Sequence, residues 1–259
     1  ENLRKEIKNS SKVNESVLNY LYATLLQKYL GNNIRAINQR GETRTKQSND
    51  FLTWTATDFY DEINKAYEKS IKNSETLHAY DLLYYKEILE ITPYSDVKNT
   101  SLFDFIFEKN ITYYKSRIHD WRLNDEETIW PILMSSPNEF IKFNPEKVNN
   151  LSLKKMILLM QLNESYYLKN NKEKLDVAYY ERLKLSKNNS TTIPLFQSKI
   201  EELEQTATNE SFKQQLRLER VQYWYSITVK GGKKNYYPNA LSLIDSMIKH
   251  KVNLNTLAE

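Results

Sequence analysis

The sequence predicts an all-α protein made of stacked antiparallel helical hairpins that form an α-α superhelix. Three observations predict this class. Only four glycines and six prolines occur among 259 residues, which leaves few signals for tight turns between strands. Apolar residues recur at spacings of three and four, the period of amphipathic helices. Serine, threonine or proline stands before several of these stretches, where such residues favour a helix start.

The first expected helix covers residues 12–30, where valine, leucine and tyrosine recur with helical spacing. Residues 31–33, Gly-Asn-Asn, are expected to end it in a left-handed conformation. Residues 41–50 are all polar or glycine, so they are expected to form a surface loop. The second helix is expected to begin at residues 55–58, Thr-Ala-Thr-Asp, which offer N-cap chemistry.

A third helix is expected over residues 74–91, because Pro93 disfavours helical geometry in the residue before it. Ser101 is expected to cap the next helix. The apolar run 102–107 is compatible with a buried strand by periodicity alone, but its continuation to Lys115 favours a helix.

The middle of the chain, residues 119–150, contains three of the six prolines and is expected to form short turns with one short helix at 139–142. A succession of helices is then expected, at residues 151–170, 172–187, 195–206, 211–230 and 238–248.

One helical-array domain is expected over residues 1–259, with a subdivision into residues 1–130, an irregular connection at 131–150, and residues 151–259. The last two helices carry Arg220, Tyr-Trp-Tyr at 223–225 and Pro-Asn-Ala-Leu at 238–241. This wording partly matches a tetratricopeptide unit, although no fixed repeat period runs through the chain. The C-terminal part is therefore expected to be similar to tetratricopeptide repeats.

The amino-acid composition excludes several classes of function. The 37 basic and 33 acidic residues are interspersed. They do not form the clustered basic face that indicates nucleic-acid binding, so no nucleic-acid partner is predicted. The absence of cysteine excludes disulfides, thiolate zinc sites, cysteine nucleophiles and thioesters within this chain. The longest apolar run, residues 156–160, is too short for a membrane span. Because the chain starts at Glu1 without a leader, we expect a mature form or a fragment of a larger protein, with any export signal outside it.

Residues with catalytic chemistry are sparse. The three histidines are dispersed, and no metal-binding, nucleophile-elbow or phosphate-loop motif is present. His119-Asp120 is the one candidate for a general base with its orienting group. Adjacent carboxylates occur at 61–62, 125–127 and 201–202, where consecutive residues point in different directions and indicate solvated charge. We therefore predict no enzyme activity, no catalytic residue, no metal site and no cofactor. An all-helical enzyme using His119-Asp120 or a carboxylate pair is the alternative.

The four tryptophans allow two interpretations. A tryptophan beside a proline or at a helix start, such as Trp130 or Trp54, indicates core packing or a lock between helices. The alternative is a groove for carbohydrate or peptide, lined by Trp54, Trp121, Trp130 and Trp224.

Four groups of residues, in order, give the chain a family resemblance. The first group is a helix-and-loop pattern that ends in Asp-Phe-Leu-Thr-Trp at 50–54, and the second pairs residues 80–83 with 100–106. The third joins Glu139-Phe140 to a later helix, and the last is the hairpin described above. The individual residues are Leu26, Tyr29, Asn33, Arg35, Arg40, Thr43, Leu158, Leu162, Tyr166, Asp176, Glu181, Arg182 and Leu183.

In this order and spacing, residues 18–250 resemble the N-terminal helical region of large bacterial alpha-2-macroglobulin-family proteins. The family's thioester needs a cysteine, which this chain lacks, and its β-sandwich repeats are not recognisable here. The resemblance implies a non-catalytic helical scaffold and protein-interaction module of an exported protease-inhibitor-type protein, located in the periplasm or at the outer membrane. The implied partner is a protein, either other domains of the same chain or a protease.

A binding surface is predicted at the loop between the first two helices, at Arg35, Arg40, Arg44 and Trp54, because arginine and tryptophan often anchor interfaces. The alternative is that these residues lock the loop onto the next hairpin. A second class of function also stays open: a glycan- or peptide-binding envelope protein of the SusD-like kind, suggested by the aromatic residues.

Overall fold

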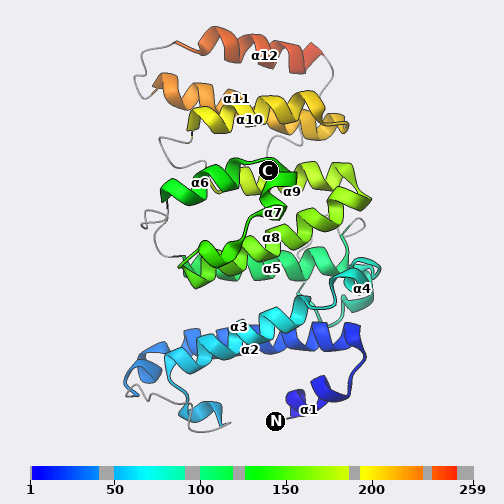
Figure 1. Cartoon of the computed structure of the whole chain (residues 1–259), viewed down its shortest axis with the longest axis vertical. Helices are drawn as coiled ribbons and strands as arrows, with labels where there is room; N and C mark the ends of the chain where they lie inside the picture. Colours follow the sequence, from blue (N-terminus) through cyan, green and yellow to red (C-terminus); the bar gives the residue numbers. More distant parts are fainter. Residues whose placement is uncertain are drawn as a thin grey trace. The chain divides into compact units, whose positions relative to one another are not determined.

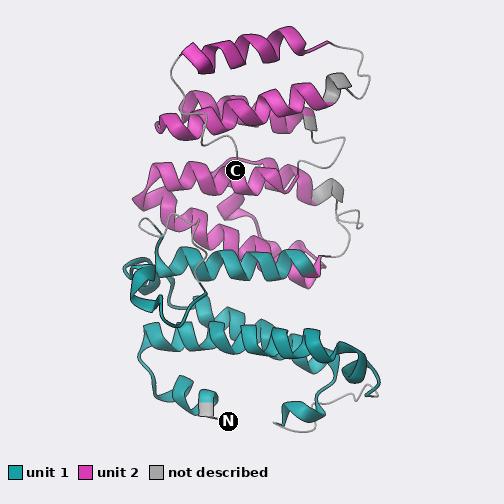
Figure 2. Cartoon of the chain, turned by 180° about the vertical axis from the view of Figure 1, so that it is seen from behind, with its two compact units in different colours: residues 1–116 teal, residues 117–259 magenta. Residues whose placement is uncertain are grey.

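A computed structural model of the whole chain describes residues 2–40, 50–90, 100–118, 126–186, 193–229 and 235–249 (Figure 1). Every regular element in these ranges is helical, and their one β-type pairing is an isolated bridge between Asp81 and Ser101. The all-α prediction is therefore confirmed. The chain divides into two compact units, residues 1–116 and 117–259 (Figure 2). Residues 131–150, expected to connect two halves, lie inside the second unit.

The first unit is built around one long helical hairpin. Its two arms, α2 and α3, run antiparallel and side by side (Figure 1), and each arm has fully buried side chains, such as Ala23 and Ile63. The elements of this unit are α1 (Asn2–Asn9), α2 (Lys12–Asn38), η1 (Phe51–Thr53), α3 (Ala56–Ile71), α4 (Ser74–His78), η2 (Leu82–Tyr85) and α5 (Leu102–Arg117).

Helix α3 begins where the sequence predicts. The Thr55 hydroxyl accepts a hydrogen bond from the Asp58 N–H, and the Asp58 carboxylate accepts one from the Thr55 N–H. This reciprocal capping box satisfies backbone donors that a helix leaves free at its start. Ser101 and Asp104 make the same exchange at the start of α5, which confirms a helix rather than a strand there.

Helix α2 extends further than the sequence predicts. It runs through Gly31 to Asn38, so the expected left-handed stop at residues 31–33 is wrong. Two side chains explain the continuation: the Asn33 amide donates to the Tyr29 carbonyl within the helix, and Ile37 is fully buried beyond it. Burial of the last turn outweighs the weak helix preference of glycine, which amounts to about 1 kcal/mol.

The single helix expected at residues 74–91 is also wrong, since the chain forms the short α4 and η2 instead. The Leu82 N–H donates to the Thr100 carbonyl, and the Leu102 N–H donates to the Tyr80 carbonyl. The Asp81 side chain accepts from the Leu83 N–H and starts η2. This pairing with a distant segment breaks the helix after His78. Pro93 lies outside the described residues.

The second unit stacks two helical hairpins and a final helix. The α8–α9 and α10–α11 pairs are antiparallel, and α12 packs on α11 (Figure 1). Its elements are α6 (Glu126–Met134), α7 (Pro137–Lys142), η4 (Pro145–Lys147), α8 (Leu151–Asn170), α9 (Lys172–Lys184), α10 (Ile193–Thr206), α11 (Glu210–Val229) and α12 (Tyr237–Lys249). The five C-terminal helices lie close to their predicted positions, and one core joins residues of α6 and α9–α11, including Leu183, Phe196, Ile200 and Leu216.

Helix α6 is the element of this unit that the prediction missed. The sequence predicts only turns and one short helix over residues 119–150, yet α6 spans Glu126–Met134 with Pro131 inside it. Proline lacks the N–H for a helical hydrogen bond and normally marks a helix boundary. Here Ile129, Trp130 and Leu133 are buried, so packing holds the short helix in place.

Candidate functional site

The first unit carries an open groove with a volume of about 1120 Å³, which lies between α1, α2 and the turn η1. We call it the α1–α2 groove. In Figure 1, α1 lies below α2 at the edge of the unit. The groove has an apolar wall, a basic rim and an aromatic end, each supplied by a different element.

The apolar wall is one face of α2. Tyr22, Leu25, Leu26 and Tyr29 follow one another at helical spacing and line the groove over about two turns. Leu26 is buried as its floor, whereas Leu25 is 57% exposed. An exposed leucine in a concave surface is more informative than one on an open face, because it leaves apolar area for a ligand to cover.

The basic rim belongs to α1, which presents Arg4, Lys5 and Lys8 to the groove. Arg4 fixes this helix in place. Its Nε and Nη2 atoms donate to the Tyr22 hydroxyl at 2.8 and 2.5 Å, and Nη2 lies 3.1 Å from the Glu62 carboxylate of α3. Lys5 and Lys8 are exposed and make no hydrogen bond or ion pair in the part of the chain that the structure describes. Their positive charges therefore remain available to a ligand.

Burial raises the pKa of the Tyr22 hydroxyl, while its hydrogen bond with Arg4 acts against that rise. The hydroxyl accepts from Arg4 and donates to Glu62 at 3.3 Å. Arg4, Tyr22 and Glu62 thus form a small network that neutralises the arginine on the inner side of the groove and leaves the two lysines as its uncompensated charges.

The aromatic end comes from η1. Its first residue, Phe51, meets the Tyr29 ring edge to face at 5.0 Å between ring centres and is 40% exposed. Asp50 caps the turn, with its carboxylate accepting from the Leu52 N–H at 3.0 Å. Asp50 also lines the groove.

The residues predicted to bind a partner occupy different environments. Trp54 is 1% exposed and packs against Phe59, with ring centres 5.2 Å apart. Arg40 donates to the Trp54 carbonyl at 2.8 Å, which ties the end of α2 to the start of α3. Arg35 is exposed on α2, and Arg44 lies outside the described residues.

The Trp54 and Arg40 contacts are those expected of a lock between loop and hairpin, the alternative interpretation of this cluster. A ring that is 1% exposed has no surface for a partner. Sequence reasoning missed Arg4, whose guanidinium lies 5.3 Å from the centre of the Trp54 ring. Nothing in the short α1 sequence indicates this contact, because its partners lie in other helices.

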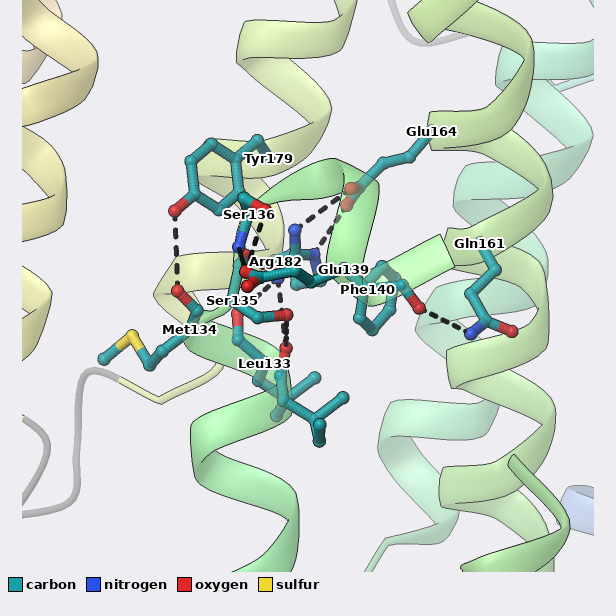
Figure 3. Close-up of polar contacts among 11 residues, drawn as sticks. Leu133, Met134, Ser135, Ser136, Glu139, Phe140, Gln161, Glu164, Tyr179 and Arg182 are labelled. Carbon is teal, nitrogen blue, oxygen red and sulfur yellow. Dashed lines mark hydrogen bonds and ion pairs between the residues drawn. The ribbon is translucent and has the colours of Figure 1, made fainter. Parts of the chain in front are cut away.

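A second polar cluster lies inside the second unit (Figure 3). Arg182 of α9 donates to both carboxylate oxygens of Glu164 in α8, at 2.6 and 3.0 Å. It also donates to the carbonyls of Leu133 and Ser135 at the end of α6, at 2.6 and 3.0 Å. The centre of the Phe140 ring lies 3.9 Å from the guanidinium carbon. The arginine thereby satisfies carbonyls that a helix leaves free at its C-terminus.

This cluster is closed to solvent. The side chains of Arg182 and Glu164 are 0% and 1% exposed. Burial raises the pKa of the Glu164 carboxyl, and the hydrogen bond and charge of Arg182 act against that rise. Since no substrate from solution reaches either group, the cluster serves the packing of α6, α8 and α9.

The other catalytic candidates do not assemble into a site among the described residues. His119 and Asp120 lie outside them. Glu62 bonds to Arg4, Glu201 pairs with Arg220, and Glu202 pairs with Lys199. No three histidine or carboxylate side chains in the described ranges stand close enough to hold a metal ion.

The alternative prediction of a carbohydrate- or peptide-binding groove lined by the four tryptophans is not met by the three rings that the structure describes. Trp54 and Trp130 are 1% and 6% exposed, so both belong to cores. Trp224 is half-buried and contacts Arg220 and Tyr236, and Trp121 lies outside the described residues.

Fold and site together define an all-α protein with an amphipathic surface groove. No family model matches the chain, and neither does any curated protein or solved structure. Within the described ranges, no helix has the length and apolar character needed to cross a membrane.

Proposed function

We propose that this chain is a non-catalytic helical scaffold that binds a segment of another protein in the α1–α2 groove. The observation that carries the proposal is the exposure of Leu25 and Phe51, 57% and 40%, in a concave surface whose walls are held by hydrogen bonds and ring contacts. Such preformed grooves suit helices or extended segments of a partner.

The size of the groove favours a protein segment over a small molecule. Its volume of about 1120 Å³ lies above the range of about 300–1,000 Å³ that is usual for small-molecule pockets. The wall formed by Tyr22 to Tyr29 is also linear and about two helical turns long, which matches the side-chain ladder of a partner helix.

The resemblance to the helical region of bacterial alpha-2-macroglobulin-like proteins suggests the parent protein, its location and its partner. The module is then part of an exported protease-inhibitor-type protein in the periplasm or at the outer membrane. Its partner is another domain of that protein or a protease.

The proposal is tested with three fluorescent, stapled helical peptides of about 14 residues. All carry one stripe of leucine and phenylalanine and differ only in the residue on one flank, which is Glu, Gln or Lys. Fluorescence anisotropy measures their affinity for the wild-type chain, for Leu25→Asp and for the matched control Leu241→Asp. Leu241 of α12 has almost the same exposure, 59% against 57%.

At least one peptide is expected to bind the wild type, and Leu25→Asp is expected to weaken it by about tenfold or more, the effect of losing an apolar anchor. Leu241→Asp is expected to bind like the wild type, and circular dichroism checks that both variants fold. Binding of none of the peptides, or equal losses in the two variants, contradicts the proposal.

Glycan binding in an envelope protein is the second candidate, favoured by the rings of Tyr22, Tyr29 and Phe51 in the groove. Aromatic rings of this kind offer flat apolar faces with polar edges. A rise in melting temperature with oligosaccharides that is lost in Phe51→Ala supports this candidate, and the absence of any rise argues against it.

A further inference from the structure

The inference concerns the partner's chemistry and rests on the proposed function. We infer that the α1–α2 groove selects an amphipathic helix that is acidic on the flank facing α1. Lys5 and Lys8 line the groove on the side of α1, so the groove distinguishes the flanks of a bound helix as well as its apolar face.

Charge at the rim is the first argument. Helix α1 holds three basic residues and one acidic residue, and the acidic residue, Glu6, does not line the groove. Arg4 is matched by Glu62, which leaves Lys5 and Lys8 as the charges that a ligand meets. Their spacing of three residues places both on one side of the helix, where they face two carboxylates one turn apart.

The apolar ladder is the second argument. Leu25 and Phe51 are exposed, and the Phe51 ring packs against Tyr29. A separate amphipathic helix would provide apolar contacts for Leu25 and Phe51 and negative charge for Lys5 and Lys8.

The test uses the same Glu-, Gln- and Lys-flanked peptides and adds a charge-reversal variant, Lys5→Glu/Lys8→Glu. A matched control, Lys65→Glu/Lys69→Glu, reverses two exposed lysines on α3 that do not line the groove. Affinities are measured at low and high salt. Vesicles of phosphatidylcholine with phosphatidylglycerol form a further arm, since an anionic membrane also offers negative charge.

We expect the Glu peptide to bind the wild type most tightly and the Lys peptide least. Lys5→Glu/Lys8→Glu is expected to lower the affinity for the Glu peptide about tenfold at low salt and to raise the affinity for the Lys peptide. The affinity for the Gln peptide is expected to change by less than about twofold. High salt should shrink these differences because it screens exposed charges. The control variant should bind all three peptides as the wild type does.

The failures of the two proposals are distinguishable. If the three peptides bind equally and charge reversal changes nothing, the acidic preference is wrong while groove binding stands. If all three peptides fail, the proposed function fails with it. Binding to anionic vesicles without binding to peptide overturns both in favour of a membrane surface.

Discussion

Arg182 of α9 and Glu164 of α8 form a two-pronged ion pair, 2.6 and 3.0 Å between donor and acceptor atoms, with both side chains closed to solvent. The same guanidinium bonds to the last carbonyls of α6. One side chain thus connects three helices. Lysine cannot replace it, because an ammonium group lacks the planar fork that serves a carboxylate and two carbonyls together.

Removal of the Arg182 side chain is therefore expected to destabilise the fold strongly. In Arg182→Met, the Glu164 carboxylate stays buried without its cation, and the end of α6 loses its donors. Breaking one half of a buried pair typically costs about 3–5 kcal/mol, so we expect a loss of that size in the free energy of unfolding by urea. The double variant Arg182→Met/Glu164→Leu should recover part of the loss. A change below about 1 kcal/mol in the single variant would refute this role.

Thr55→Ala tests the capping box of α3. The variant removes the hydroxyl that accepts from the Asp58 N–H, and a lost N-cap costs about 1 kcal/mol. Thr57→Ala, on the exposed side of the same helical turn, is the control and should change stability by less than about 0.5 kcal/mol. Thr55→Ser should retain most of the wild-type stability. Equal effects at the two positions would argue against the cap.

Gly31→Ala distinguishes a continuous α2 from the stop that the sequence predicts. Open space surrounds the position of a β-carbon at Gly31. Alanine in a helix interior is therefore expected to raise the free energy of unfolding by up to about 1 kcal/mol. A left-handed glycine would give the opposite sign, because alanine is strained there. Urea unfolding of the two proteins decides between them.

Tyrosines that are buried or half-buried should make the fold less stable at alkaline pH. Burial raises the pKa of Tyr179 to about 12, and it also raises those of Tyr67 and Tyr114. The unfolded side chain ionises near pH 10, so the unfolded state loses protons first. Their contribution to stability is therefore complete below about pH 10 and disappears as the pH rises toward 12.

Melting temperatures measured across this alkaline range check the prediction. Tyr179→Phe should show a shallower fall than the wild type, because one shifted group is gone. Tyr84→Phe is the control, since Tyr84 is 82% exposed and should leave the slope unchanged. Identical slopes in all three proteins would contradict the assigned cause.

Local signals in the sequence were sufficient for much of the fold. The Thr55–Asp58 and Ser101–Asp104 exchanges connect residues three apart, so their spacing is visible in the sequence. The C-terminal helices were equally predictable from their long apolar periodicity, and α10 and α12 also have a proline near the start. Features that depend on residues far apart in the sequence could not be predicted in this way. The break after α4 depends on pairing with residues 100–102, and α6 is held by packing and by Arg182.

The candidate site shows the same division. Trp54 and Arg40 were identifiable as a cluster because they flank one loop, but their burial was not readable from the sequence. Arg4 was missed because its partners, Tyr22 and Glu62, lie on two other helices. Lys5 and Lys8 resemble any exposed lysines until the fold places them beside Leu25.

Binding of an acidic amphipathic helix in the α1–α2 groove is most directly tested by a methyl spectrum of leucine-labelled protein during titration with the Glu-flanked peptide. The largest shifts are predicted at Leu3, Leu25 and Leu26, which line the groove. Leu216 and Leu241, which belong to the second unit, should stay in place. Shifts centred on the second unit, or none at saturating peptide, would contradict the account.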